Sequence, residues 1–210
     1  MLKIFELKAG FRRERLVIHD FSLEVKPKQR LWIKCPHFGV GQLLMALLMG
    51  QLKPFDGEIR IMGKRPYLLA TSSIPYLMRN LGLFWPDIPL SHRDTARENL
   101  FWRLAASGEG RHRSLVESAL SLFGLSNIAD LDVRRLSRAE RVKLALARAI
   151  ISRPPLVLAL EPVRDLPAPE ARRVLRILAH MTLLGSAVVI ISSEDPPDVP
   201  SFELIEIREQ

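Results

Sequence analysis

The last third of this sequence alternates short, entirely apolar runs with amphipathic segments, and this alternation constrains the fold more than any other feature. The apolar runs are Leu156–Leu160 and Ala187–Ile191, and helices are predicted over residues 137–151 and 169–181. Strands that are apolar on both faces are typical of parallel sheets, in which crossover helices cover both faces. A last strand is predicted over residues 202–207. The sequence therefore predicts an α/β fold with a mainly parallel sheet at its core.

The first 70 residues favour strands, and residues 91–135 favour helices. In the first part, one helix is expected from Gln42 to Met49. In the second part, Asp94 is expected to cap a helix, and residues 114–123 repeat apolar side chains at helical spacing. The length of 210 residues suits one domain. We therefore expect one domain, residues 1–210, with a core lobe of residues 1–90 and 136–210 and a helical subdomain of residues 91–135.

Charge and composition limit which partners and which cellular compartment are expected for the protein. The formal net charge is +8 at pH 7, which indicates an anionic partner: nucleic acid, phosphates or the acidic inner face of a membrane. No apolar run approaches the roughly 18 to 20 residues that span a bilayer, and the single Cys35 excludes a disulfide framework. We expect a cytoplasmic protein. The arginines gather in two clusters: Arg12, Arg13 and Arg15, and then Arg134, Arg135, Arg138, Arg141 and Arg148.

A phosphate-binding loop is the first chemistry that the sequence suggests. Its pattern, G-x-x-x-x-G-K-[ST], offers backbone N–H groups and a lysine to phosphates, and a hydroxyl to magnesium. The equivalent window runs from Pro36 to Leu43 and keeps Gly39 and Gly41, but Gln42 stands in the lysine position and Leu43 in the hydroxyl position. Pro36 replaces the first glycine and has no N–H to donate. Taken alone, the window also fits a plain glycine turn.

Further motifs follow in order along the chain. They are Pro54-Phe-Asp-Gly57-Glu-Ile, Glu98-Asn99-Leu100, Leu136-Ser137-Arg-Ala-Glu140, Ala145-Leu-Ala-Arg148-Ala149 and Pro154-Pro-Leu-Val-Leu-Ala-Leu160-Glu161-Pro162. This ordered set resembles the ATP-binding subunit of ABC transporters across nearly the whole chain. The resemblance implies a P-loop NTPase-like ABC ATPase fold, with an antiparallel strand region at the N-terminus and a helical subdomain. It also implies that a membrane partner selects the transported substrate.

Several positions depart from the pattern of that family. The strand that ends in Asp-Glu-Pro in the family ends here in Leu160-Glu161-Pro162, so Leu160 replaces the residue that holds the magnesium shell. Pro86 stands where the family has its nucleotide-sensing glutamine, and Glu194 stands where it has its switch histidine. The LSGGQ signature reads Leu136-Ser137-Arg138-Ala139-Glu140, so Arg138 replaces its first glycine.

The roles that the resemblance implies compete with plainer interpretations. Phe11 is either the aromatic residue that stacks on adenine or an ordinary core residue. Ser137 either reaches the γ-phosphate held by an opposite subunit or forms a capping box with Glu140. Glu161 aligns with the residue that polarises the attacking water, or is a leftover carboxylate at a strand end. The residues expected at a nucleotide are Phe11, Gly39, Gly41, Gln42 and Ser137.

A hydrophobic stretch after residue 81 is a candidate docking patch. Trp85 and Ile88, with Trp102 further along, lie where the family's groove receives a coupling helix of the membrane subunit. Exposed apolar patches of this kind mark interaction sites. Packing inside the core is the other interpretation of these three residues.

The losses at the nucleotide site predict a catalytically degenerate subunit. Without the lysine and both magnesium anchors, affinity for a nucleotide is expected to fall on the order of a thousandfold. No cofactor is then firmly expected: any ATP is held weakly, this chain is not expected to hold magnesium, hydrolysis is expected to be absent or very weak, and Glu161 is vestigial. Such a pseudo-ATPase would pair with an integral membrane permease and a second ATP-binding subunit, peripherally on the inner face of the membrane.

Two alternatives stay open at this point. One is an active ABC ATPase with atypical ligation, in which Glu161 is the base and Gln42 and nearby arginines replace the lysine. The other is a basic ABC-like protein that binds nucleic acid through the arginine clusters. The sequence does not favour nucleic acid as a partner, because it lacks interleaved aromatic and basic residues and any helix-turn-helix or zinc signature.

Overall fold

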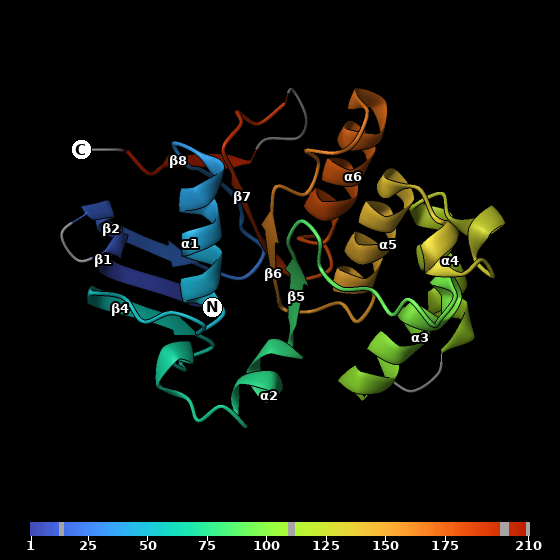
Figure 1. Cartoon of the computed structure of the whole chain (residues 1–210), viewed down its shortest axis with the longest axis horizontal. Coiled ribbons are helices and arrows are strands. Elements are labelled where there is room, and N and C mark those ends of the chain that lie inside the picture. Colours follow the sequence, from blue (N-terminus) through green and yellow to red (C-terminus); the bar gives the residue numbers. More distant parts are fainter. Residues whose placement is uncertain (13–14, 109–111, 198–201, 209–210) are drawn as a thin grey trace.

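The computed structural model describes residues 1–12, 15–108, 112–197 and 202–208, and their helices and strands confirm the predicted α/β class (Figure 1). In chain order the elements are β1 (Leu2–Arg12), β2 (Arg15–Val25), β3 (Arg30–Lys34), α1 (Phe38–Leu48), β4 (Asp56–Ile61), α2 (Ile74–Met78), β5 (Leu81–Phe84), α3 (Ala96–Ser107), α4 (Arg113–Leu122), α5 (Arg138–Ile150), β6 (Leu156–Leu160), α6 (Ala168–His180), β7 (Ala187–Ser192) and β8 (Glu203–Glu206).

The strands form two sheets of different kinds. β2, β1 and β4 pair in that order as an antiparallel sheet, and the second sheet has the order β5-β6-β7-β3-β8 with every pair parallel. Helix α1 lies between the two sheets and contacts strands of both, while α5 and α6 cover the other face of the parallel sheet (Figure 1). Helices α3 and α4 lie beyond α5, on the side away from the antiparallel sheet.

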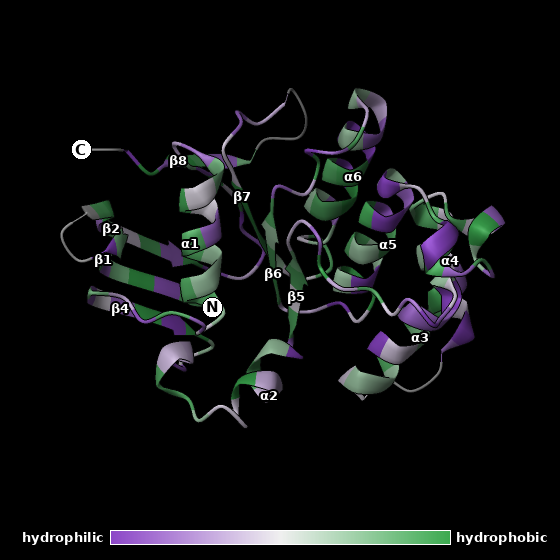
Figure 2. Cartoon of the chain, viewed as in Figure 1, coloured by the Kyte–Doolittle hydropathy of each residue, from purple (hydrophilic) through white to green (hydrophobic). Residues whose placement is uncertain are grey.

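The apolar strands of the parallel sheet divide the hydrophobic core in two. In β6, Leu156, Leu158 and Leu160 belong to the cluster that contains α1, whereas Val157 and Ala159 belong to the cluster that contains residues of α3, α4, α5 and α6. Successive side chains of a strand point to opposite faces, so a strand covered on both sides must be apolar at every position. Figure 2 shows the strands β5, β6 and β7 of this sheet as almost entirely hydrophobic.

Several predicted boundaries need correction. The helix expected from Gln42 begins four residues earlier, at Phe38. Thr95, and not Asp94, is the N-cap of α3. The helix predicted from residue 137 is confirmed as α5, with Ser137 as its N-cap. Of the first arginine cluster, Arg13 lies outside the described residues. Within the described part of the chain, no helix is both long enough and apolar enough to cross a membrane.

Candidate functional site

The carboxyl ends of the parallel strands meet at one edge of the sheet and define the candidate site. In open α/β sheets, ligands bind in the crevice outside these ends. Here the ends are followed by Cys35 after β3, Trp85 after β5, Glu161 after β6 and Ser193 after β7. Helix α1 starts beside them, so the residues of the predicted phosphate loop and of the strand end Leu160-Glu161-Pro162 are brought together.

The connection between β3 and α1 is much shorter than the phosphate-loop pattern requires. Only residues 35–37 separate the strand from the helix, and Gly39 and Gly41 lie in the first turn of α1. A Cβ atom on Gly41 would lie 2.9 Å from Cδ1 of Leu160 and 3.3 Å from Cγ2 of Ile191. Gly41 therefore allows the helix to pack closely on the ends of β6 and β7. Its backbone N–H donates to the carbonyl of His37 at 3.5 Å.

The side chains around the start of α1 are mostly apolar. A cavity of about 350 Å³ lies between α1 and the segment that follows β5. Gln42 is exposed and contributes to its lining, but Leu43, the residue in the hydroxyl position, is buried in the core. Pro36 is exposed beside the strand end. The lining is polar at Gln42, Gln51 and Asp87 and otherwise consists mainly of Phe38, Met45, Ala46, Met49, Trp85, Pro86 and Leu160.

Two cations at this edge of the sheet, Lys34 and Arg164, contact other groups of the chain. Lys34 Nζ forms an ion pair with Asp195 Oδ1 at 2.5 Å, and this carboxylate raises the pKa of the lysine. The guanidinium carbon of Arg164 lies 4.8 Å from the centre of the Phe38 ring, within the usual range of a cation–π contact. Both cations thus face groups of their own chain at this edge of the sheet.

Phe11 is the penultimate residue of β1 and lies beside the start of α1. Its side chain is 58% exposed, so the interpretation of Phe11 as an ordinary core residue is wrong. A Cβ atom on Gly39 would lie 3.4 Å from Cζ of Phe11, which places the ring against the first turn of the helix. Phe11 is therefore an exposed aromatic residue near the strand ends.

Glu161 is buried, with only 4% of its surface exposed, and accepts three hydrogen bonds from the end of β7. Its Oε2 accepts from the hydroxyl of Ser192 at 2.8 Å, and its Oε1 accepts from the backbone N–H and the hydroxyl of Ser193 at 2.7 and 2.6 Å. Its own backbone N–H donates to the carbonyl of Ile191 at 2.8 Å. Glu161 has a left-handed backbone conformation, with φ of 48°. The residue thus fastens the ends of β6 and β7 together.

Cys35 lies under the same strand ends. Its backbone N–H donates to the carbonyl of Ser192 at 2.7 Å. Burial, and to a lesser extent the nearby Glu161, raises the pKa of the Cys35 thiol to about 12. The thiol is therefore neutral at physiological pH and is a poor nucleophile.

Glu194, in the switch position, contributes through its backbone. Its N–H donates to the hydroxyl of Ser192 at 3.1 Å, and its carbonyl accepts from the indole of Trp32 at 3.0 Å. The side chain itself is exposed. The backbone of residue 194 thus completes the hydrogen-bonded network around Glu161.

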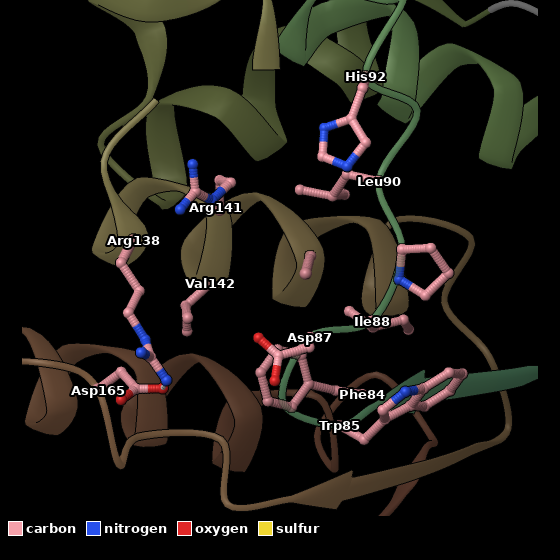
Figure 3. Close-up of a pocket in the computed structure, with 12 residues that line it drawn as sticks. Phe84, Trp85, Asp87, Ile88, Leu90, His92, Arg138, Arg141, Val142 and Asp165 are labelled. Carbon is pink, nitrogen blue, oxygen red and sulfur yellow. Dashed lines mark hydrogen bonds and ion pairs between the residues drawn. The ribbon is translucent and has the colours of Figure 1, made fainter. Parts of the chain in front are cut away.

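Ser137 takes part in the capping box that was one of its two predicted roles. The Glu140 backbone N–H donates to the Ser137 hydroxyl at 3.3 Å, and Glu140 Oε2 accepts from the backbone and the hydroxyl of Ser137 at 2.8 and 2.7 Å. The next residue, Arg138, forms an ion pair with Asp165 at 3.0 Å. Figure 3 shows this pair on one side of a cavity of about 450 Å³, with Asp87 and Trp85 on the opposite side.

The three docking candidates line a further cavity, of about 350 Å³, on the outer side of β5. Trp85 and Ile88 are half-buried and Trp102 is 52% exposed, and all three contribute to its wall. Two residues that the sequence analysis did not single out for this patch, Arg103 and Arg148, lie in the same wall. Arg148 belongs to the Ala145–Ala149 motif, where helical spacing alone does not indicate that it turns toward β5.

The partners of Glu161 were also missed, although the sequence carried a signal for them. Ser192 and Ser193 directly follow the apolar run of β7, as Glu161 follows that of β6. The ends of adjacent parallel strands lie side by side, so polar residues that follow two such strands are expected to meet. To predict the contact of Glu161 with these serines, one must also know that β6 and β7 are adjacent in the sheet.

Comparison with known proteins agrees with the architecture. The model of the ABC transporter family matches residues 18–164. Lipoprotein-releasing system ATP-binding protein LolD 2 of Rhodospirillum rubrum is 32% identical over 184 residues, which cover 85% of this chain and 79% of that protein. Cytochrome c biogenesis ATP-binding export protein CcmA of Bordetella bronchiseptica is 32% identical over 169 residues, with coverage of 80% and 74%.

A solved structure gives the same result for the fold. The dimeric structure of a post-hydrolysis state of the ATP-binding cassette MJ0796, bound to ADP and Pi, matches with a TM-score of 0.79. The match covers 92% of this chain and 88% of that one, at 22% identity. This likeness shows that the chain has the fold of an ATP-binding cassette.

Proposed function

This chain belongs to the ABC transporter family, and from that membership we propose that it is a subunit that keeps the family fold but does not hydrolyse ATP. It serves as a structural or regulatory partner of an integral membrane permease, at the cytoplasmic face of the membrane. It pairs with a second ATP-binding subunit, either another copy or an active relative. We further propose that residues 91–135 form the helical subdomain of a single domain.

The hydrogen bonding of Glu161 carries this proposal. A general base must be within reach of the water whose proton it accepts. Both carboxylate oxygens of Glu161 instead accept hydrogen bonds from Ser192 and Ser193, and the residue is almost completely buried. This arrangement supports a structural role for Glu161, in which its carboxylate fixes two strand ends.

The lining of the neighbouring cavity does not fit a magnesium triphosphate. A triphosphate requires convergent N–H groups and cations, and magnesium requires oxygen ligands. The cavity offers Gln42 in the place of a lysine, and Leu160 in the place of the aspartate. Within the described residues, no cluster of three or more His, Cys, Asp or Glu residues is arranged to hold a metal.

The start of α1 supports the same conclusion. A phosphate loop uses several successive N–H groups that point inward from a wide turn. Here the connection is limited to residues 35–37, and the N–H groups of Val40 and Gly41 both donate to the carbonyl of His37. Weak attraction of an anion to the helix N-terminus is all that remains of the site.

The arginine contacts favour a protein partner over nucleic acid. In the second arginine cluster, Arg134 pairs with Asp132 and Arg138 pairs with Asp165. Arg141 and Arg148 donate to backbone carbonyls of Leu136 and Pro89. A nucleic-acid interface needs cations that are free to contact phosphates. The apolar wall that contains Trp85, Ile88 and Trp102 is instead suited to a segment of the permease.

Hydrolysis and nucleotide binding by the purified chain test the proposal. We expect phosphate release from ATP to equal that of the Glu161→Gln variant, and ATP with magnesium to shift the melting temperature no more than ATP alone. A family member with an intact phosphate loop is the positive control. Hydrolysis above background that Glu161→Gln abolishes would refute the proposal and establish the active ATPase with atypical ligation.

A further inference from the structure

The two edges of the parallel sheet differ in charge. At the carboxyl edge, acidic residues follow β5, β6 and β7: Asp87, Glu161, Asp165, Glu194 and Asp195. At the opposite edge, the amino edge, the chain enters β5, β6, β7 and β3 through residues 79–80, 151–155, 181–186 and 26–29. None of these four described connections contains an aspartate or a glutamate. Their charged residues are Arg79, Arg153, Lys26 and Lys28.

The four connections lie side by side, because the strands that they enter are parallel neighbours in the order β5-β6-β7-β3. Hydrogen bonds join the connection before β7 to those on either side of it. The hydroxyl of Ser186 donates to the carbonyl of Pro154 at 2.7 Å, and the backbone N–H of Val188 donates to the carbonyl of Gln29 at 2.8 Å. The cations therefore form a row along the amino edge, with residues 181–186 between them.

Two adjacent leucines are exposed in the middle of this row. Leu183 is 76% exposed and Leu184 is 50% exposed. Hydrogen bonds fix the turn that carries them, since the backbone N–H of Ser186 donates to the carbonyl of the buried Met181 at 3.1 Å. Gly185 closes the turn in a left-handed conformation, with φ of 101°. The turn therefore holds both leucine side chains in water, between the cations.

The cations of the amino edge are available to an anion from outside the chain. Within the described residues, none of the four forms an ion pair. The guanidinium carbon of Arg79 lies 4.7 Å from the centre of the Tyr76 ring, and Tyr76 is 64% exposed. Two carboxylates flank the row: Glu24 pairs with Lys3 at 2.9 Å, and Glu203 begins β8 beside β3. Most of the positive charge along this edge therefore stays unneutralised.

Exposed leucines between unpaired cations match the surface of an acidic bilayer. Such a surface offers anionic headgroups to cations and, directly beneath them, an acyl layer to apolar side chains. Nucleic acid also offers phosphates, but it has no apolar layer for the leucines, and Tyr76 alone is no platform for stacked bases. Tyrosine is instead favoured where one side of a surface is apolar and the other is wet, as at a membrane. The surface groups thus favour lipid over nucleic acid.

We propose that the amino edge of the parallel sheet binds acidic phospholipid directly. Leu183 and Leu184 enter the boundary between headgroups and acyl chains, while Arg153 on one side and Lys26 and Lys28 on the other bind headgroup phosphates. This contact needs neither a nucleotide nor a permease, so it does not rest on the proposed function.

The lipid contact is compatible with the permease contact proposed above. Met78 and Leu81, at the amino end of β5, line the cavity that contains Trp85 and Trp102. Arg79 follows Met78 directly. The two surfaces therefore adjoin at β5, and both can be used by a chain held against a membrane.

Sedimentation of the purified chain with lipid vesicles tests the inference. The vesicles contain phosphatidylcholine alone or phosphatidylcholine with phosphatidylglycerol, and the bound fraction is measured over a series of NaCl concentrations. We expect the phosphatidylglycerol vesicles to bind the chain much more tightly, and salt to weaken this binding. Replacing both Leu183 and Leu184 by glutamine should weaken it at least about tenfold. The matched control is Leu122→Gln, which removes a leucine that is 47% exposed on α4, and it should bind like the unmodified chain.

The contribution of the cations is measured in the same assay. Lys28→Gln and Arg153→Gln should each weaken binding roughly fivefold. Arg113→Gln removes the same charge from an exposed position on α4 and should leave binding almost unchanged. Lys28 and Arg153 have left-handed backbone conformations, with φ of 65° and 46°, so thermal melting of each variant verifies that it is folded.

A fluorescent label measures insertion of the turn without removing a cation. Leu183→Cys provides one exposed thiol for an environment-sensitive dye, because Cys35 is buried. The emission of the dye should rise and shift to shorter wavelength when phosphatidylglycerol vesicles are added. The same dye on Leu122→Cys should not respond.

Three results would overturn the inference. The first is equal binding of the chain to vesicles with and without phosphatidylglycerol. The second is binding that the leucine and cation variants leave unchanged, which would assign the lipid contact to another surface. The third is binding to duplex DNA or to polyglutamate but not to vesicles, which would assign the cations to nucleic acid or to an acidic protein segment. None of these results bears on ATP hydrolysis by the chain, which tests the proposed function separately.

Discussion

Replacing Glu161 by glutamine tests whether the carboxylate of this residue has a structural or a catalytic role. The substitution keeps the size and shape of the side chain but removes its charge and one acceptor. In the structure, Oε1 and Oε2 together accept three hydrogen bonds from Ser192 and Ser193, and the residue is buried. A glutamine retains one acceptor oxygen, which can serve Ser193, while its amide group faces the hydroxyl of Ser192.

The expected loss of stability follows from these three bonds. A hydrogen bond to a charged group contributes about 1.5–3 kcal/mol, against about 0.5–1.5 kcal/mol for a neutral pair. Weakening all three bonds by about 1 kcal/mol each gives a loss of about 3 kcal/mol. For a chain of this size, the melting temperature should fall by roughly 6–12 °C.

Urea and thermal unfolding measure this difference. Glu194→Gln is the matched control, because it makes the same chemical change two residues beyond Ser192, on an exposed side chain, and should leave the unfolding midpoint unchanged. A double-mutant cycle with Ser192→Ala should give a positive coupling energy with Glu161. If Glu161→Gln unfolds at the same midpoint as the unmodified chain, the carboxylate does not fasten the strand ends and the reasoning fails.

Three further predictions concern the capping box of α5, the close packing of Gly82 against α5, and the buried thiol of Cys35. Ser137→Ala should lower the free energy of unfolding by about 1 kcal/mol. Ser137→Asn keeps a side chain that can cap the helix and should lower it by less. Urea unfolding of the two variants measures this difference. Gly82→Ala should cost about 1–3 kcal/mol in the same assay, because its Cβ would lie 2.7 Å from the carbonyl oxygen of Ala149. The pKa of Cys35 is raised to about 12 from an ordinary value of 9.0, so the unfolded thiol loses its proton first and stability should fall as pH rises above about 9. Cys35→Ala should show a smaller decline in melting temperature over that range.

Sequence patterns predict the sheet well because burial on two faces leaves a strong signature. The runs Leu156–Leu160 and Ala187–Ile191 are apolar at every position, and both become central strands of the parallel sheet. The order of motifs then predicts a helical subdomain over residues 91–135, which periodicity alone does not place. Local patterns would also have corrected one error. Thr95 is followed three residues later by Glu98, the spacing of a capping box, which is a stronger signal than Asp94 alone.

The start of α1 is not predictable from local preferences, because tertiary packing determines it. Two glycines in a first turn weaken a helix by roughly 1 kcal/mol each relative to alanine, so a loop is the natural expectation for residues 38–41. The structure makes them helical because Gly41 fits against Leu160 and Ile191. The partner of Gly41 lies more than 100 residues away in the sequence, and no short pattern contains that information.

The packing of the strand ends bears on the proposed loss of nucleotide binding. Leu160 brings an apolar side chain to the end of β6, and the first turn of α1 packs on it through Gly41. Beside it, the carboxylate of Glu161 has its partners in Ser192 and Ser193. On the proposed function, a lysine placed at position 42 would therefore add a cation without a loop to aim it. The proposal thus attributes weak nucleotide binding to the packing of this end of the sheet as well as to the side chain at position 42.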